Sequence, residues 1–258
     1  MRLLHDLSHS RNRLNRTISP LDSMRDPKYP DQYYDIGARA LDLVLFASEL
    51  CDKPHFPRIL DLPSGYGRVL RWLRAHYDYA EITACDLERP GVDFCAAEFG
   101  AQPVYSQPDL AQVKFAQPFD LIWVGSLFTH LDRDRWLSTL DQLIALTAEC
   151  GILIFTTHGR CFTTLLSRGR PELAGDVDVA ALLSKYGRNG FAYEPYRSSA
   201  DGSYGVSATS GAWLQDVLQS RNDVIMRAYL EEAWGMQDVV VLYKASRYYE
   251  SAATLAKA

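Results

Sequence analysis

The sequence predicts an α/β fold built on a mostly parallel β-sheet, and three observations support that prediction. Short apolar runs alternate with stretches of helical periodicity along most of the chain. The apolar runs are continuous, which is typical of parallel strands covered on both faces. The first run ends in a carboxylate, Asp61, and two closely spaced glycines, Gly65 and Gly67, follow it. A strand, a tight bend and a helix start in this order form a ligand-binding edge of such a sheet.

The composition is that of a globular protein with one substantial core. The chain has 258 residues, of which 47% are hydrophobic and 23% charged, and its net charge is −5. A negative balance argues against nucleic acid as a partner. No apolar run reaches the roughly 18 residues of a membrane span, and the N-terminus lacks the apolar core of a signal peptide. We therefore expect a cytoplasmic protein with no membrane partner.

The cysteines and histidines indicate neither a disulfide framework nor a metal site. The cysteine count of five is odd, no Cys-x-x-Cys occurs, and the six histidines show no metal-ligand spacing. A reducing compartment is consistent with this usage.

The elements are predicted in order as follows. Residues 1–30 are polar and arginine-rich and form an N-terminal arm or lid, although a disordered tail would have the same composition. Residues 31–50 have helical spacing and end before two prolines. Parallel strands are predicted at 58–62, 81–85, 103–105, 119–124 and 151–156. Helices are predicted between them at 66–76, 90–99 and 133–147.

Residues 157–208 interrupt this alternation and are predicted to be an insertion on the acceptor side of a domain spanning 31–245. The insertion contains short helical stretches near 162–167 and 179–186 and extended pieces at 191–196 and 204–209. A helix at 212–219 and two strands at 224–231 and 238–244, joined by a turn near Trp234 and Gly235, complete the domain. Residues 246–258 are predicted to be a C-terminal tail.

The loop after the first strand allows two ligand classes. A dinucleotide site would need a third glycine where this chain has Leu70. A carboxylate such as Asp61 would repel a diphosphate but suits a cationic amine. A third alternative is an ordinary strand-to-helix turn in which the glycines serve sterics only.

The segment Asp61-Leu62-Pro63-Ser64-Gly65-Tyr66-Gly67-Arg68 resembles motif I of the class I S-adenosylmethionine-dependent methyltransferases. The chain departs from that motif at Pro63, which stands where the first glycine is usual. The resemblance covers about residues 31–245. It implies a Rossmann-like seven-stranded sheet with an antiparallel last strand and helices on both faces, and S-adenosyl-L-methionine as the cofactor.

By this resemblance, the cofactor-binding residues follow the predicted strands. Asp61 is expected to handle the methionine amine. Asp86, with Leu87 beside it, ends the second strand and is expected to accept the ribose hydroxyls, a role equally suited to NAD. A helix N-cap is the alternative for Asp86. The remaining expected cofactor-binding residues are Tyr34, Pro63, Gly65, Tyr66, Gly67, Ser106, Gln107, Gly125 and Ser126.

Two of these assignments have alternatives. Ser106 and Gln107 stand where the family often has an adenine-binding Asp, while Asp109 comes slightly late. Tyr34 is expected over the methionine carboxylate, with core packing as the alternative. Arg68 is a second candidate for that carboxylate.

Two histidines are candidates for a general base. Methyl transfer from a sulfonium is an in-line displacement, and an alcohol acceptor must lose its proton to a base with a pKa near 7. Histidine meets that requirement. His130 follows the fourth strand in a segment similar to one in some O-methyltransferases, and His158 ends the fifth strand. Packing or capping is the alternative role for each.

The function we expect is methyl transfer to a small or medium polar acceptor, either a small molecule or a glycan, through an oxygen nucleophile such as a sugar hydroxyl. The aromatic residues of the insertion form either an acceptor pocket or a small satellite core. An NAD-linked oxidoreductase and a non-catalytic S-adenosylmethionine-binding module remain alternatives. The sequence does not determine the oligomeric state and is compatible with a homodimer.

Overall fold

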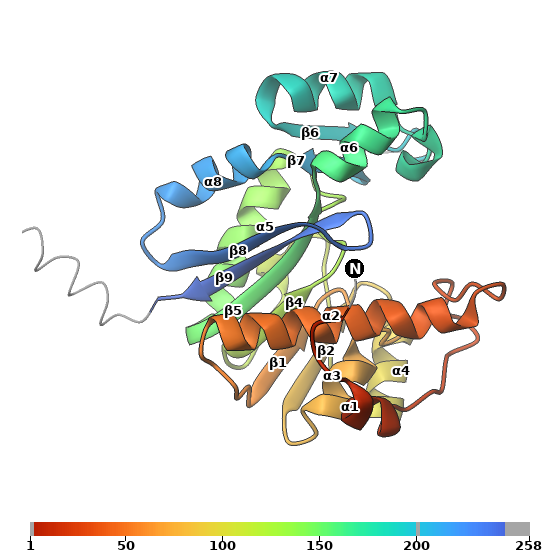
Figure 1. The fold of residues 1–258 in the computed structure, drawn as a ribbon, viewed down its shortest axis with the longest axis vertical. Coiled ribbons are helices and arrows are strands. Elements are labelled where there is room, and N and C mark those ends of the chain that lie inside the picture. Colours follow the sequence, from red (N-terminus) through yellow and green to blue (C-terminus); the bar gives the residue numbers. More distant parts are fainter. Residues whose placement is uncertain (1–2, 200–201, 246–258) are drawn as a thin grey trace, which may run out of the picture. The chain divides into compact units, whose positions relative to one another are not determined.

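The computed structural model of the protein describes residues 3–199 and 202–245 (Figure 1). Its main sheet has seven strands in the order β3-β2-β1-β4-β5-β9-β8. Strands β1, β2, β3 and β4 pair in parallel, whereas β8 and β9 pair antiparallel. This arrangement confirms the fold class predicted from the sequence. The seven strands are β1 (Arg58–Asp61), β2 (Glu81–Asp86), β3 (Gln102–Tyr105), β4 (Phe119–Val124), β5 (Thr147–His158), β8 (Val224–Trp234) and β9 (Gln237–Lys244).

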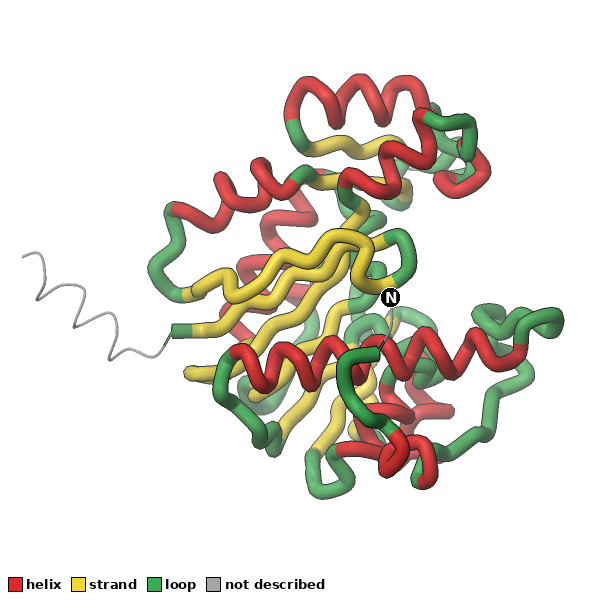
Figure 2. The backbone as a smooth tube through the Cα atoms, in the orientation of Figure 1, coloured by secondary structure: helices red, strands yellow, loops and turns green. Residues whose placement is uncertain are grey.

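Helices flank the strands (Figure 2), and most begin and end within a few residues of the predicted bounds. The exception is the helix after the glycine loop, which was predicted from Tyr66 and begins only at Leu70, because residues 65–69 form successive turns. The helices around the main sheet are α1 (Ser8–Asn12), α2 (Pro30–Leu50), α3 (Leu70–His76), α4 (Arg89–Phe99), α5 (Arg133–Leu146) and α8 (Gly211–Gln219).

The chain divides into two compact units, and β5 contributes residues to both. The first comprises Met1–Trp123 with Ala145–Ile152, and the second comprises Val124–Ile144 with Leu153–Ala258. The expected tail at 246–258 lies outside the described residues. Among the residues that are described, no helix is both long enough and apolar enough to span a membrane.

In the first unit, the N-terminal arm is packed against α2 and α3. The backbone amides of Leu4 and His5 donate to the buried carboxylate of Asp42 on α2, at 3.0 and 2.9 Å. Short helix α1 contacts α3, and Ser10 on α1 is hydrogen-bonded to His76 at 2.9 Å. The arm therefore has specific contacts with the elements that carry the glycine loop.

In the second unit, the segment between β5 and α8 has an apolar core of its own. Helices α6 (Arg160–Ser167) and α7 (Val179–Asn189) and the two-stranded sheet of β6 (Phe191–Pro195) and β7 (Gly205–Thr209) surround it. Its fully enclosed side chains include Phe162, Leu182 and Ala208. Strand β7 also hydrogen-bonds to the segment after β4, where the Ser207 amide donates to the Thr129 oxygen. It therefore links that segment to β6.

Candidate active site

Asp61 is a buried carboxylate without a hydrogen-bond partner. It ends β1, is 1% exposed, and neither of its oxygens accepts a hydrogen bond of normal geometry from any described residue. Burial raises its pKa well above the usual range, and the nearby charge of Asp86 raises it further. The Leu70 amide and the Arg68 guanidinium oppose this shift without reversing it. A buried carboxylate in this state favours a cationic partner.

The glycine loop that follows Asp61 has a conformation that requires glycine. Gly65 and Gly67 have φ values of 50° and 76°. A Cβ on Gly67 would lie 2.5 Å from the Phe99 ring, whereas a Cβ on Gly65 would meet nothing within 4 Å. The backbone at Gly65 therefore borders open space that a ligand can approach. Gly91 on α4, which the sequence did not single out, packs so closely that its Cβ would lie 2.5 Å from the Gly65 carbonyl oxygen.

Asp86 holds the glycine loop in place. One of its carboxylate oxygens accepts the Gly65 amide at 2.7 Å and the other accepts the Glu88 amide at 2.9 Å. Glu88, and not Asp86, is the N-cap residue of α4. Each Asp86 oxygen keeps a free lone pair for a ribose hydroxyl. Leu87, 60% exposed, offers an apolar surface directly after β2.

Among the polar residues after β3, Ser106 is a better candidate for cofactor binding than Gln107 or Asp109. The Ser106 amide donates to the Asp86 carbonyl at 2.8 Å, and its side chain is half-buried. Gln107 is exposed. Asp109 accepts the Ala111 amide at 3.0 Å and caps a short 3-10 helix, so its position does not suggest a ligand role.

Arg71, which the sequence analysis did not select, links the glycine loop to the arm. It is 1% exposed and donates to the carbonyl oxygens of Gly67 and Tyr66 at 2.9 and 3.3 Å. It also donates to the carbonyl oxygens of Asn15 and Thr17 at 3.2 and 2.8 Å. The only sequence signal was a charged residue inside the otherwise apolar run 69–73.

The hydroxyl groups of Tyr33 and Tyr34 both bind the arm. Tyr33 donates to the buried Asp22 carboxylate at 2.6 Å and accepts from Arg71 at 3.2 Å. Tyr34, which was the expected residue over the methionine carboxylate, donates to the Arg16 carbonyl oxygen at 2.8 Å. Arg68, half-buried, is close enough to Asp61 and Asp22 for their charges to act on its pKa.

In the second unit, Ser126 is held in a strained conformation after β4. Its φ is 62°, which is uncommon outside glycine. The Ser126 amide donates to the Thr156 hydroxyl at 2.8 Å, and Gln237 at the start of β9 donates to the Ser126 hydroxyl at 2.9 Å. Thr156 in turn donates to Gln237 at 2.5 Å. Gly125, next to Ser126, is buried.

The two candidate histidines donate to carbonyl oxygens of the same strand. Nδ1 of His130 lies 2.8 Å from the Gly205 oxygen, and Nδ1 of His158 lies 3.1 Å from the Ser207 oxygen. Because a carbonyl oxygen only accepts, each Nδ1 must carry the proton. In the neutral rings Nε2 is then left as the acceptor.

The surroundings of the two rings differ. His158 is 8% exposed and stacks on Phe162 with ring centroids 3.8 Å apart. Burial, with a smaller contribution from His130, lowers its pKa to about 3. His130 is half-buried and stacks on Tyr204, which is 54% exposed. Burial also lowers the pKa of His130, and the Gly205 hydrogen bond partly offsets that change.

The sheet order, the acidic residue and the glycine loop define the class of domain. Residues 59–151 match the family described as "Methyltransferase domain". This part of the chain is therefore a methyltransferase domain of class I, the S-adenosylmethionine-dependent type.

Several solved structures have a similar fold. A S-adenosylmethionine-dependent methyltransferase from Clostridium acetobutylicum ATCC 824 has a TM-score of 0.57 at 14% identity, with 81% of this chain and 92% of that chain covered. The plantazolicin methyltransferase BamL, solved with a triazolic desmethylPZN analog and SAH, has a TM-score of 0.54 at 13% identity, covering 85% and 90%.

Human N-acetylserotonin methyltransferase, solved with SAM, has a TM-score of 0.50 at 16% identity, covering 81% of this chain and 52% of that chain. At these sequence identities, the similarity shows a shared fold and nothing more. A search of curated protein sequences found no match.

The first unit contains groups that fit S-adenosylmethionine. Asp61 supplies an unpartnered anion for the ammonium group, Gly65 borders open space, and Asp86 retains acceptor capacity for hydroxyl groups. Leu87 adds exposed apolar surface that suits the adenine ring. The unpartnered Asp61 is the most specific of these features, because a diphosphate would leave it uncompensated.

Proposed function

We propose that this protein transfers a methyl group from S-adenosylmethionine to an oxygen nucleophile of a small or medium polar acceptor, such as a sugar hydroxyl. The observation that carries the proposal is Asp61, whose two buried oxygens lack a partner among the described residues. A cationic amine would compensate that charge, whereas the diphosphate of a dinucleotide would not. When bound, S-adenosylmethionine supplies a methyl group that is already activated for displacement.

The chain's own residues divide the remaining tasks. Asp61, Gly65 and Asp86 hold the cofactor, with Tyr66, Gly67, Leu87 and Ser106 as further contacts. Arg71 keeps the loop in its binding conformation through the Gly67 and Tyr66 carbonyl oxygens. Methyl transfer is accelerated mainly by aligning the reactants and excluding water. These contacts should therefore contribute to turnover as well as to the affinity for the cofactor.

His130 is the base that best fits an oxygen nucleophile. Its Nε2 is the free acceptor of the neutral ring, and the ring is partly accessible beside Tyr204. His158 has the same tautomer, but a pKa of about 3 makes it a weak base at neutral pH. We therefore assign proton removal to His130 and assign His158 to holding the β7 strand.

Calorimetry with three ligands tests the cofactor assignment. S-adenosylmethionine and S-adenosylhomocysteine should both bind, and NAD should not. If NAD alone binds, the methyl-transfer proposal is wrong and the oxidoreductase alternative is right.

Transfer of a labelled methyl group to a panel of hydroxyl, amine and carbon acceptors tests the reaction. Label on a hydroxyl compound supports the proposal, and label only on amines or carbon contradicts the assignment of an oxygen nucleophile. If the cofactor binds but no acceptor is labelled, and S-adenosylmethionine is also not hydrolysed, the result favours the non-catalytic binding module.

A further inference from the structure

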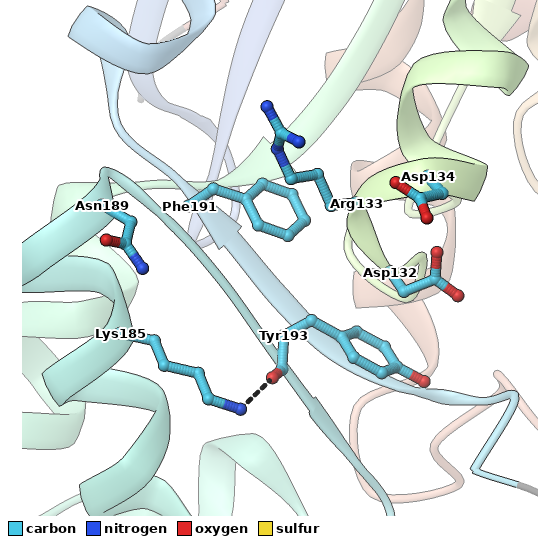
Figure 3. Close-up of a pocket in the computed structure, with 7 residues that line it drawn as sticks. All are labelled: Asp132, Arg133, Asp134, Lys185, Asn189, Phe191 and Tyr193. Carbon is cyan, nitrogen blue, oxygen red and sulfur yellow. Dashed lines mark hydrogen bonds between the residues drawn. The ribbon is translucent and has the colours of Figure 1, made fainter.

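A pocket of about 350 Å³ in the second unit has no assigned role. It lies between the start of α5, the end of α7 and strand β6 (Figure 3). Its volume is within the range of about 300–1,000 Å³ that is usual for small-molecule sites. The residues that line it are Asp132, Arg133, Asp134, Lys185, Asn189, Phe191 and Tyr193.

We propose that this pocket binds a neutral sugar unit of the acceptor, a role that rests on the proposed methyl transfer. The aromatic residues supply the first reason. Phe191 and Tyr193 stand two residues apart on β6, so both side chains emerge on the same face of the strand. The Tyr193 hydroxyl donates to the Gly202 carbonyl oxygen at 2.8 Å, which fixes that ring. Phe191 is 8% exposed and packs on Trp213 with ring centroids 4.8 Å apart, so its ring is fixed as well. The half-buried Tyr193 ring is the one that offers apolar surface to the C–H face of a sugar.

Unused hydrogen-bonding groups supply the second reason. Figure 3 shows the Phe191 ring between Asn189 and Arg133, with Asp134 on the α5 side. The side chains of Arg133, Asp134 and Asn189 make no hydrogen bond or ion pair with any part of the chain that the structure describes. A guanidinium, a carboxylate and an amide together can donate to and accept from a set of hydroxyl groups.

The charges of the pocket select a neutral ligand. Its lining has two carboxylates, Asp132 and Asp134, and two cations, Arg133 and Lys185. Lys185 is already neutralised by Glu194, whose carboxylate oxygen is 2.6 Å from its amine. Asp132 is paired with Arg135 at 2.6 Å. With no excess of positive charge, the pocket has little affinity for a phosphate or a carboxylate.

The pocket is built on the same loops as the base. Asp132 and Arg133 follow His130 by two and three residues. The segment whose Gly202 oxygen holds Tyr193 continues to Gly205, whose oxygen holds His130. A sugar unit bound in the pocket therefore contacts the segments that carry and hold His130, and binding energy away from the reacting atoms can contribute to turnover.

Saturation-transfer difference NMR with defined sugars tests the proposal on the full chain. The probes are methyl α-D-glucopyranoside, methyl α-D-mannopyranoside and methyl α-L-rhamnopyranoside, with glucuronic acid and glucose 6-phosphate as charged comparators. At least one neutral glycoside should bind in preference to both charged sugars. Binding of no neutral glycoside, or preference for a charged one, overturns the proposal.

Two exposed lining residues and one neighbour locate the binding. Asn189→Ala and Asp134→Ala should each weaken the neutral glycoside about tenfold, the size of a lost hydrogen bond to a bound ligand. Arg188→Ala, next to Asn189 on α7 but outside the pocket, should leave affinity within about twofold. If all three variants bind the neutral glycoside with the same affinity, the sugar binds elsewhere and the proposal is contradicted.

The test separates this inference from the proposed function, because sugar binding requires neither cofactor nor methyl transfer. If neutral sugars bind at the pocket and S-adenosylmethionine does not bind the protein, sugar binding at the pocket stands, but its role toward a methyl acceptor fails with the methyl-transfer proposal. If methyl transfer occurs and neutral sugars do not bind, the pocket assignment fails alone.

Discussion

At the residue scale, Asp61 has opposite effects on folding and on binding. The isolated domain must bury a carboxylate that finds no hydrogen-bond partner among the described residues, and its raised pKa reflects that cost. The same unpartnered charge is what a cationic amine can bind. Such a group is typical of a functional position that lowers the stability of the unliganded protein.

Asp61→Asn should stabilise the unliganded protein and weaken the cofactor. The amide removes the buried charge, so we expect the free energy of unfolding to rise by about 0.5–2 kcal/mol at pH 7. Cofactor binding should fall by about 1–3 kcal/mol, because a charge-assisted hydrogen bond is lost. Urea unfolding and calorimetry measure the two changes.

The pH dependence of the free energy of unfolding supplies a second test of the Asp61 carboxylate. Because the folded pKa is raised, the folded state holds the proton longer than the unfolded chain as the pH rises, and stability decreases above the usual value of 3.8. Asp61→Asn should remove this decrease, whereas Asp216→Asn, an exposed change on α8, serves as the control. Lower stability of Asp61→Asn at pH 7 would contradict the account of a buried uncompensated charge.

His130→Ala should lower turnover by about 10²–10⁴-fold and leave cofactor affinity near that of the wild type, because a base acts on the acceptor proton. Single-turnover measurements with the labelled methyl group, together with calorimetry, separate the two effects. His55→Ala, at an exposed position in the first unit, is the control. If His158→Ala lowers turnover by this amount and His130→Ala does not lower it, the role of base belongs to His158.

His158 should make the folded protein sensitive to acid. Its pKa falls from 6.5 to about 3 on folding, so the unfolded chain takes up this proton first as the pH decreases. The free energy of unfolding therefore decreases from about pH 6.5 downward. Between pH 7.5 and 5.5 this one group should account for about 1.4 kcal/mol.

His158→Asn keeps a donor near the Ser207 oxygen and removes the titrating group. Urea unfolding at the two pH values should therefore show a smaller decrease for the variant than for the wild type, by about that amount. An identical decrease in both proteins would show that the buried ring does not titrate as inferred.

At the element scale, α3 joins the N-terminal arm to the glycine loop through Arg71. The side chain contacts four backbone carbonyl oxygens, two in the loop and two in the arm. The sequence could predict α2, β1 and β2, because apolar periodicity and end signals are local. It could not predict this connection, because backbone acceptors 54 and 56 residues away leave no side-chain pattern.

Arg71→Met should release the arm and weaken cofactor binding. Four carbonyl oxygens lose a donor, so we expect a loss of about 2–4 kcal/mol in the free energy of unfolding. Limited trypsin digestion should cleave sooner after Arg16, and calorimetry should show weaker binding of S-adenosylhomocysteine.

Arg74→Met is the matched control, because Arg74 lies one turn later on α3 and donates to the Phe99 and Ala80 oxygens but to none in the arm. If both variants release the arm equally, the connection through Arg71 is not specific.

At the scale of the whole molecule, the strands were more predictable than the site. Apolar runs identified the inner strands β1, β2, β4, β5 and β9 because most of their side chains are buried, whereas the edge strands β3 and β8 are more exposed. Asp61 and Asp86 could be selected as candidate ligand residues because strand ends and ligand-binding edges coincide in such sheets. The tautomers of His130 and His158 were not predictable, since they depend on carbonyl oxygens of β7 that only tertiary structure brings to the rings.

Unfolding should occur as one transition that the cofactor product shifts as a whole. Strand β5 contributes residues to both compact units, so neither can lose it without disrupting the other. At a hundredfold excess over its Kd, S-adenosylhomocysteine should add about 2.7 kcal/mol, which raises Tm by roughly 5–10 °C in a chain of this size. Scanning calorimetry with and without the ligand measures the shift, and Asp61→Asn at the same ligand concentration should show a smaller one. Two separate peaks, of which the ligand moves only one, would show that the two units unfold independently.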